Sequence, residues 1–251
     1  MEQIAVSPKG HIIKKNEHNY AISFSREMLV FSTSQLNGGI NIMNNCFNHK
    51  LTKWISNTSD LPNSSISEYL REISIELDLD PKTSTGLMTT ASMKNASFEL
   101  VKDDNISLFA IITAGAGVNA VRAGDPPCYH EVYPDTFTPI GGTINILLVI
   151  EAKLPPEALA RVSIIATEAK TAALQDLKTP SCFSDGIATG TGTDGLIIAC
   201  HQEDSVFFTD TGNHSKLGHL ISTIIKKGVT KSIIKEQEDY EKRKGERKNN
   251  D

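Results

Sequence analysis

The chain of 251 residues contains few cysteines, and their positions exclude two common uses of this residue. Its four cysteines, Cys46, Cys128, Cys182 and Cys200, are far apart and form no Cys-x-x-Cys pair. A zinc cage or a disulfide framework usually shows closely spaced cysteines. The pattern therefore indicates reduced thiols, and we expect a cytoplasmic protein.

Long apolar runs and an excess of positive charge are also missing. No apolar run approaches the roughly 20 residues that a membrane helix needs, and the opening MEQIAVSPKGHIIKK lacks the apolar core of a signal peptide. The net charge of −5 argues against nucleic-acid binding, which normally uses a basic face. We therefore expect no membrane and no nucleic acid as partner. The composition, 39% hydrophobic and 22% charged, suits a globular protein with a sizeable core.

Several catalytic and cofactor motifs are absent from the sequence as well. It contains no HExxH, no Walker A loop and no Gly-x-Ser-x-Gly elbow, and it has no histidine pair at helical i, i+4 spacing. GAGVNA at 115–120 formally matches the dinucleotide fingerprint. However, Gly124, Pro126 and Pro127 follow where that fingerprint requires a helix, so a dinucleotide site is the weaker alternative.

The stretch from Gly141 to Cys200 organises the chain. Its apolar runs Ile144–Ile150 and Leu196–Cys200 predict two buried strands. Between them, an alanine-rich helix is predicted from Pro155 to about Leu177, ahead of Pro180. Small polar residues flank both strands, as GGT before the first and as Thr189 to Asp194 before the second. A buried scaffold with such loops at its rim often binds a polar ligand.

The remaining segments predict an α+β fold, with mostly antiparallel or mixed sheet layers covered by helices. Further strands are predicted at 11–15, 20–24, 28–33, 87–93, 96–101, 107–113 and 205–208. Ser67 is the predicted cap of a helix that ends near Leu79, and Asn213 that of a final helix. We expect one domain over residues 1–235 and a charged, disordered tail over 236–251.

Five segments, in a fixed order and spacing, carry a resemblance to a known family. They are AGAGVNAVRAGDPP, GGTINILLVI, ALARVSIIATEAKTAALQDL, ATGTGTDGLIIAC and TDTGNHSKLG. Together they resemble the adenosylcobinamide amidohydrolase family of corrinoid salvage, and the earlier LNGGI and LMTTASMKNAS are similar to it as well. The resemblance covers about Met28 to Ile225.

The resemblance implies a cytoplasmic enzyme that hydrolyses the amide between the aminopropanol arm and the corrin ring of adenosylcobinamide. The products would be aminopropanol and adenosylcobyric acid, which re-enters cobalamin synthesis. The implied partner is a small-molecule corrinoid. The pattern calls for no cofactor and leaves open both a divalent metal and a homo-oligomer. A corrinoid-binding module without catalysis is the alternative function.

Amide hydrolysis needs several groups together, because an enzyme lowers such a barrier by about 8–23 kcal/mol and one oxyanion donor supplies only about 3–4 kcal/mol. We assign Glu168 as the general base, since burial in an apolar helix would raise its pKa. A surface pair between Glu168 and Arg161 is the structural alternative. Asp194 or Asp210 could replace Glu168, and His214 near a helix start could protonate the leaving amine.

The expected binding residues are polar and lie mostly in the segments next to the predicted strands. They are Asn37, Asn119, Arg122, Asp125, Thr143, Asn145, Lys170, Thr191, Thr193, Asp210 and Lys216. Backbone amides of Thr189–Thr193 and of the Asn37-Gly38-Gly39 turn are candidates for the oxyanion hole. Thr143, Thr171 or Thr193 could instead act as a covalent nucleophile if a base lies nearby.

Overall fold

In the part of the chain that the structure describes, a curled mixed β-sheet and three α-helices form a single domain, which confirms the predicted α+β class. The computed structural model describes residues 1–53, 55, 58–127 and 142–248. The strands of the main sheet are β1 (Glu2–Val6), β2 (Ile12–Lys15), β3 (Asn19–Ser32), β4 (Gly39–Lys50), β5 (Ser84–Thr89), β6 (Ser97–Asp103), β7 (Ile106–Ala114), β9 (Ile144–Lys153) and β11 (Gly195–His201). They follow the order β1-β2-β3-β11-β9-β7-β6, with β4 paired to β3 and β5 paired to β4. Two short strands, β8 (Ala120–Val121) and β10 (Gly190–Thr191), form a separate antiparallel pair.

The long strand β3 makes the sheet curl. Its first part pairs with β2, and its last part, Met28–Ser32, pairs with β11. The register against β4 shifts between Ser23 and Met28, so the strand bends there without ending. The two strands predicted at 20–24 and 28–33 are therefore one, and the residues between them form a bulge.

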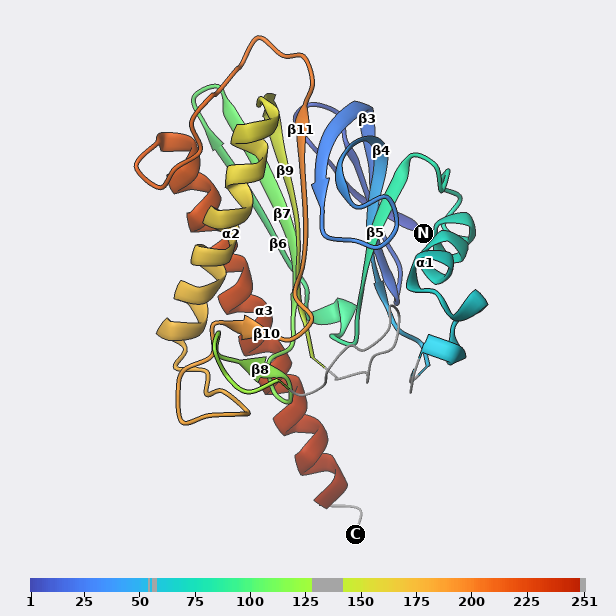
Figure 1. The fold of residues 1–251 in the computed structure, drawn as a ribbon, viewed down its shortest axis with the longest axis vertical. Helices are drawn as coiled ribbons and strands as arrows, with labels where there is room; N and C mark the ends of the chain where they lie inside the picture. The colour runs from blue at the N-terminus through green and yellow to red at the C-terminus, as the bar shows by residue number, and fades with distance from the viewer. Residues whose placement is uncertain (54, 56–57, 128–141, 249–251) are drawn as a thin grey trace.

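The helices cover the outer faces of the curled sheet (Figure 1). Helices α2 (Pro156–Asp176) and α3 (Lys216–Lys248) pack on the face formed by β6, β7, β9 and β11, and α1 (Ile66–Glu76) packs on the opposite side. Between the two parts of the sheet lies a second apolar layer, with Phe109, Leu147 and Ile197 facing Ile22 and Met28. The result is four layers, helix, sheet, sheet and helix.

The central strands are apolar on both faces because both faces are covered. Every residue of β7 is buried, and β9 is buried up to Ala152. This explains why their sequences read as continuous apolar runs rather than as alternating ones. The two buried strands and the intervening helix are confirmed as β9, β11 and α2, and the strands run parallel, a pairing that was not predicted.

Some predicted boundaries differ from the structure. Ser65 caps α1, because its side chain accepts the Glu68 N–H. Likewise, Ser215 rather than Asn213 caps α3 and accepts the Gly218 N–H at 3.0 Å. The segment 205–208 makes only an isolated bridge, between Lys153 and Phe207.

Helix α3 continues to Lys248, through the segment predicted to be a disordered tail. Its C-terminal part extends beyond the sheet (Figure 1). Polar contacts to the short helix Met93–Asn95 hold this part, with Asn95 donating to Glu236 at 2.6 Å and Lys94 pairing with Asp239. No helix in the described ranges is both long and apolar enough to cross a membrane.

Strand β4 was not predicted, because its sequence, GINIMNNCFNHK, is rich in asparagine, a residue depleted in strands. Pairing with β3 and β5 on its two sides fixes it in the sheet. Its side chains Met43, Cys46 and Phe47 are buried in the apolar layers. Tertiary packing therefore overrides local preference in this strand.

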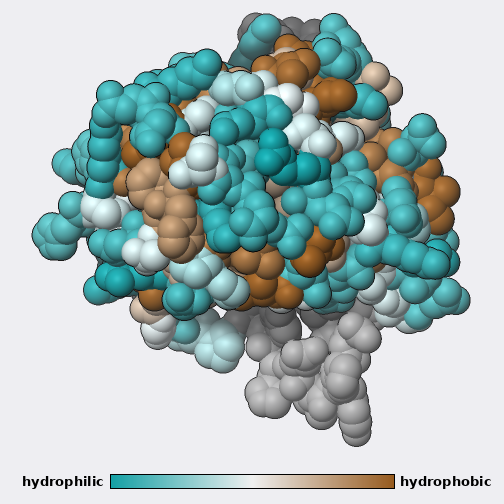
Figure 2. Space-filling view, turned by 90° about the horizontal axis from the view of Figure 1, so that it is seen from above, coloured by the Kyte–Doolittle hydropathy of each residue, from teal (hydrophilic) through white to brown (hydrophobic). Residues whose placement is uncertain are grey.

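Seen from above, the surface of the molecule is mostly hydrophilic, with hydrophobic residues in separate patches (Figure 2).

A polar cluster is buried where β9 and β11 end. His11 accepts the Ser25 N–H through Nδ1, so its Nε2 carries the proton and donates to Nε2 of His201 at 3.3 Å. His201 donates through Nδ1 to Asp204 at 2.6 Å. Burial lowers the pKa of His11 to about 4, and burial also lowers the pKa of His201.

This cluster predicts acid sensitivity of the fold. Because the folded pKa of His11, about 4, lies below the ordinary value of 6.5, the unfolded chain takes up the proton first as the pH falls. The stability that neutral His11 contributes is complete above about pH 6.5 and is lost towards pH 4, a decrease of roughly 3 kcal/mol. Urea unfolding at several pH values between these limits measures it.

His11→Gln is expected to reduce the pH dependence of the free energy of unfolding in this range. His219→Gln, at an exposed histidine of α3, serves as the matched control and should leave that dependence unchanged. Equal slopes for His11→Gln and the unmodified protein would contradict the assignment.

Candidate active site

The carboxylate of Asp194 connects three segments at the end of the sheet where β9 and β11 begin. Its Oδ2 accepts from Lys170 Nζ of α2 and from the Thr191 N–H at 3.0 Å. Its Oδ1 accepts from the Thr191 hydroxyl and from the Ile144 N–H at 3.1 Å. The side chains of Lys170 and Asp194 are only 12% and 18% exposed, so water screens this ion pair weakly.

Four donors occupy the acceptor positions that a carboxylate offers. Asp194 therefore suits the positioning of Lys170 and of the loop before β11 better than proton abstraction. The ammonium of Lys170 in turn provides a fixed positive charge at the surface of the site. Thr171, the next residue of α2, donates its hydroxyl to the carbonyl of Thr189 at 2.9 Å and fastens the same loop.

The two glycines of the TGTG sequence are required by this packing. A Cβ atom at Gly190 would overlap Asp194 Oδ2 and lie 2.7 Å from Lys170 Nζ. A Cβ atom at Gly192 would lie 3.0 Å from Oδ1 of Asn119. The absence of a side chain thus allows the loop to approach both polar groups.

The carbonyl of Gly142 lies in a second group of hydrogen bonds beside Asp194. It accepts from Asn119 Nδ2 and from the Thr193 hydroxyl, each at 2.9 Å. Gly142 has a φ of +95°, and a Cβ atom there would lie 2.9 Å from the carbonyl oxygen of Gly115. The next residue, Thr143, is buried and donates its hydroxyl to the carbonyl of Thr193 at 2.5 Å.

Two hollows adjoin these residues. A groove of about 460 Å³ between α2 and strands β3 and β11 includes Lys170 and Asp194 in its lining. Its walls are mainly apolar and include Phe31, Ile164 and Leu196. A second hollow, of about 500 Å³, is lined by Gly142, the glycine-rich loop 115–118 and the part of α3 around Tyr240. Both volumes are in the range of small-molecule sites.

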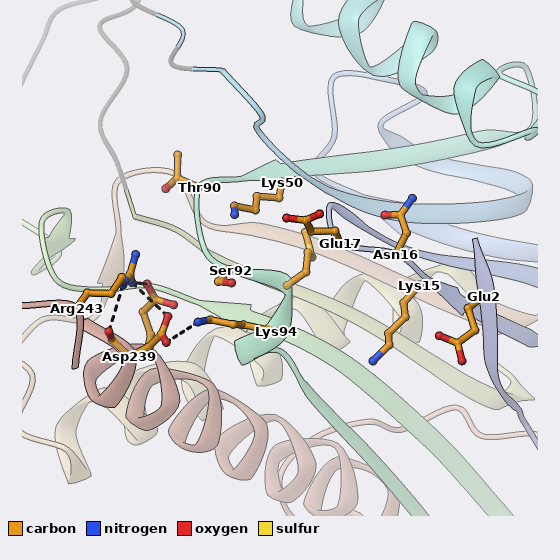
Figure 3. Close-up of a pocket in the computed structure, with 12 residues that line it drawn as sticks. Glu2, Lys15, Asn16, Glu17, Lys50, Thr90, Ser92, Lys94, Asp239 and Arg243 are labelled. Atoms are coloured by element: carbon orange, nitrogen blue, oxygen red, sulfur yellow. Dashed lines mark hydrogen bonds and ion pairs between the residues drawn. The ribbon is translucent and has the colours of Figure 1, made fainter. Parts of the chain in front are cut away.

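A third hollow, of about 640 Å³, has a strongly charged lining (Figure 3). It shares Thr90 with the second hollow, and the Thr90 hydroxyl accepts the Gly142 N–H at 2.8 Å. Asp239 pairs there with both Lys94 and Arg243 (Figure 3). The second and third hollows therefore meet at Thr90, next to the Gly142 backbone.

The structure brings six of the predicted residues together at this centre: Asn119, Thr143, Lys170, Thr191, Thr193 and Asp194. Their convergence explains why polar residues flank both central strands. Segments that are distant in the sequence meet where the parallel strands β9 and β11 start.

Glu168 lines the groove, but its side chain is exposed and accepts from Asn213 Nδ2 at 2.6 Å. The burial on which its assignment as general base depended is therefore not observed. The other candidates near the start of α3 are exposed too. Asp210 lies 3.8 Å from Arg161, and Lys216 pairs with Asp103 and Asp104; His214 is on the surface.

Four predicted binding residues make contacts elsewhere. Asn37 donates to the carbonyls of Pro81 and Ser84, both at 2.8 Å. Asn145 is 1% exposed and donates to Asn48 Oδ1 at 2.8 Å, between the two parts of the sheet. Arg122 and Asp125 line a separate small hollow, where the Ser181 hydroxyl lowers the pKa of the Asp125 carboxyl.

Sequence reasoning missed Gly190, the Gly142 carbonyl and the histidine cluster. Glycines directly beside Thr191 and Asp194 were the available signal for the first. Glu151 inside the apolar run ILLVIEAK was the signal for the buried cluster, where it accepts the Lys9 N–H at 2.9 Å.

The described residues contain no group of three or more His, Cys, Asp or Glu side chains that could hold a metal ion. The fingerprint at 115–120 leads into the short strand β8 and not into a helix. The structure therefore places no dinucleotide-type turn before a crossover helix at this motif.

A family model and a relative of known name both assign the chain to the same family. The family model described as adenosylcobinamide amidohydrolase matches residues 5–241. An adenosylcobinamide amidohydrolase of Methanosarcina mazei is 32% identical over 205 residues, which cover 80% of this chain and 84% of that protein. An uncharacterized protein of Methanocaldococcus jannaschii is 35% identical over 161 residues, covering 60% of this chain and only 62% of the relative.

Solved structures show weaker likeness. A Pyrococcus horikoshii protein has a TM-score of 0.42 and 12% identity, covering 94% of this chain and 80% of its own. A β-aminopeptidase of a Burkholderia species has a TM-score of 0.38 and 10% identity, with coverages of 93% and 82%. At these values the likeness establishes neither a shared fold nor a shared activity.

The packing around Gly190 predicts the effect of adding one methyl group. Gly190→Ala is expected to force Asp194 and Lys170 apart and to lower the free energy of unfolding by roughly 1–3 kcal/mol. Gly117→Ala is the control, since a Cβ atom there meets nothing within 4 Å. Urea unfolding followed by circular dichroism compares the two. Equal stability would mean that Gly190 does not hold this packing.

Proposed function

The chain belongs to the adenosylcobinamide amidohydrolase family, and from this premise we propose that it hydrolyses the amide linking the aminopropanol arm to the corrin ring of adenosylcobinamide. The products are adenosylcobyric acid and aminopropanol. The acid is then available for cobalamin synthesis, so the protein acts in corrinoid salvage in the cytoplasm.

The observation that supports the proposal most directly is the polar centre next to the groove. It combines the cation of Lys170, held by Asp194, with the donors of Asn119 and Thr193, which meet at the Gly142 carbonyl. Charge develops on the amide oxygen during hydrolysis, and a fixed cation beside the groove lowers the barrier. The weakly screened charge of Lys170 contributes to the same stabilisation.

The hollows around the centre fit the chemistry of a corrinoid. The apolar wall formed by Phe31, Ile164 and Leu196 suits the hydrocarbon part of a macrocycle. The charged rim of the third hollow suits the amide groups at its periphery. Binding of these distant parts of the substrate orients the reacting amide at the polar centre.

Loss of the Lys170 charge is expected to impair catalysis. The purified protein is incubated with adenosylcobinamide, and adenosylcobyric acid is measured by liquid chromatography and mass spectrometry. Lys170→Met should reduce turnover by roughly 10²–10³-fold, the effect of losing one electrostatic contact to the developing oxyanion.

Lys226→Met is the matched control, because Lys226 lies on α3 and pairs with Asp176 on the surface. It should retain the turnover of the unmodified protein. An intact substrate that stays tightly bound to the unmodified protein would contradict hydrolysis and favour a corrinoid-binding module.

The exposure of Glu168 leads to a separate prediction. A general base contributes roughly 10²–10⁴-fold to the rate. Because Glu168 is solvated and bonded to Asn213, we expect Glu168→Gln to retain turnover within about tenfold. Circular dichroism controls for folding. A loss larger than 100-fold in a folded variant would restore Glu168 to the mechanism.

A further inference from the structure

Hydrogen bonds hold the backbone on both sides of the peptide bond between Gly142 and Thr143. The Gly142 N–H donates to Thr90, and the Gly142 carbonyl accepts from Asn119 and Thr193. On the following residue, the Thr143 carbonyl accepts the Gly115 N–H at 2.9 Å. The next N–H, of Ile144, donates to Asp194.

The two donors on the Gly142 carbonyl have the geometry of an oxyanion hole. Both Asn119 Nδ2 and Thr193 Oγ1 lie 2.9 Å from the oxygen, inside the range of about 2.7–3.1 Å that such holes use. The Oδ1 atom of Asn119 is buried and has no hydrogen-bond partner in the described residues. The side-chain amide of Asn119 therefore donates to Gly142 while its buried oxygen accepts no hydrogen bond. An unpaired buried oxygen costs stability, so a purely structural role does not account for an asparagine here.

The hydroxyl of Thr143 is the nucleophile nearest to this carbonyl along the chain. Its attack on the Gly142 carbonyl carbon closes a five-membered ring. The covalent structure therefore keeps Thr143 Oγ1 close to that carbon. The hydrogen bond from Oγ1 to the Thr193 carbonyl holds the buried hydroxyl in one position. Gly142 itself, at a φ of +95°, has the backbone conformation that L side chains rarely adopt.

We propose that the protein cleaves its own peptide bond between Gly142 and Thr143 and that the freed Thr143 is the nucleophile of the amidohydrolase. In the first step Thr143 Oγ1 bonds to the Gly142 carbonyl carbon, the C–N bond breaks, and the hydroxyl proton passes to the leaving nitrogen. In the second step water hydrolyses the resulting ester. It leaves a carboxylate on Gly142 and a free hydroxyl and α-amine on Thr143.

Cleavage would also complete the active site, and this part rests on the proposed function. Once the Gly142 carboxylate departs, Asn119 and Thr193 can donate to the amide oxygen of a substrate. The new α-amine can take the hydroxyl proton of Thr143 and pass it to the leaving aminopropanol nitrogen. The acyl ester on Thr143 is then hydrolysed by water, which regenerates the hydroxyl. An intact Gly142–Thr143 bond would keep the donors occupied.

Intact-mass spectrometry of the purified full chain tests the first step without any substrate. We expect two fragments, one ending at Gly142 and one whose sequence begins Thr-Ile-Asn. The cleavage rate should be first order and independent of protein concentration, as for an intramolecular reaction. A chain that stays whole during prolonged incubation overturns the inference.

Variants separate self-cleavage from a contaminating protease. Thr143→Ala should remain whole, Thr143→Ser should still cleave, and Asn119→Ala should cleave roughly 10²–10³-fold more slowly. Thr167→Ala, an exposed threonine of α2, is the matched control and should cleave normally. If Thr143→Ala does not fold, the Thr143→Ser and Asn119→Ala rates still decide. Cleavage at an unchanged rate in Asn119→Ala contradicts the mechanism.

The assay for adenosylcobyric acid distinguishes this inference from the proposed function. A chain that remains whole but releases the acid disproves self-cleavage and leaves the proposed function standing. A cleaved chain that releases no acid disproves the proposed function and leaves self-cleavage standing.

Discussion

The carboxylate of Asp194 is the contact on which the arrangement of the polar centre depends. It binds the start of β9 through the Ile144 N–H, the strand β10 through Thr191, and helix α2 through Lys170. Two charges with little exposure to water attract strongly, but each would be costly to bury alone. The ion pair therefore fixes the distance between α2 and the sheet at this end. The shape of the groove and the position of the loop that carries Thr193 depend on this ion pair.

The sequence predicted the fold class and the central β-α-β unit because their signals are local. The apolar runs that became β7, β9 and β11 are continuous, and prolines mark the start of α2. Strand β4 gave no such signal, because its place depends on β3 and β5 rather than on its own residues. The merging of two predicted strands into β3 follows likewise from pairing partners that lie far away in the sequence.

For the site, the polar segments were identifiable but the direction of each side chain was not. Lys170 and Glu168 are two positions apart on α2, so they point to nearly opposite sides of the helix, and only Lys170 meets Asp194. Asn145 follows Ile144, which lines the groove, and the alternation of a strand turns Asn145 to the other face, between the two parts of the sheet. Choosing between such neighbours requires knowledge of which face each element buries. That information comes from the packing of α2 and β9 and not from composition.

The continuity of β3 also limits how the molecule can respond to a ligand. One strand belongs to both parts of the curled sheet, since it pairs with β2 at one end and with β11 at the other. Moving the two parts as separate rigid bodies would strain this shared ladder of backbone hydrogen bonds. The groove between α2 and β3 spans β11, so its walls rest on this one sheet. We therefore expect a ligand to enter the groove through rearrangement of its side chains rather than through movement of the two parts of the sheet.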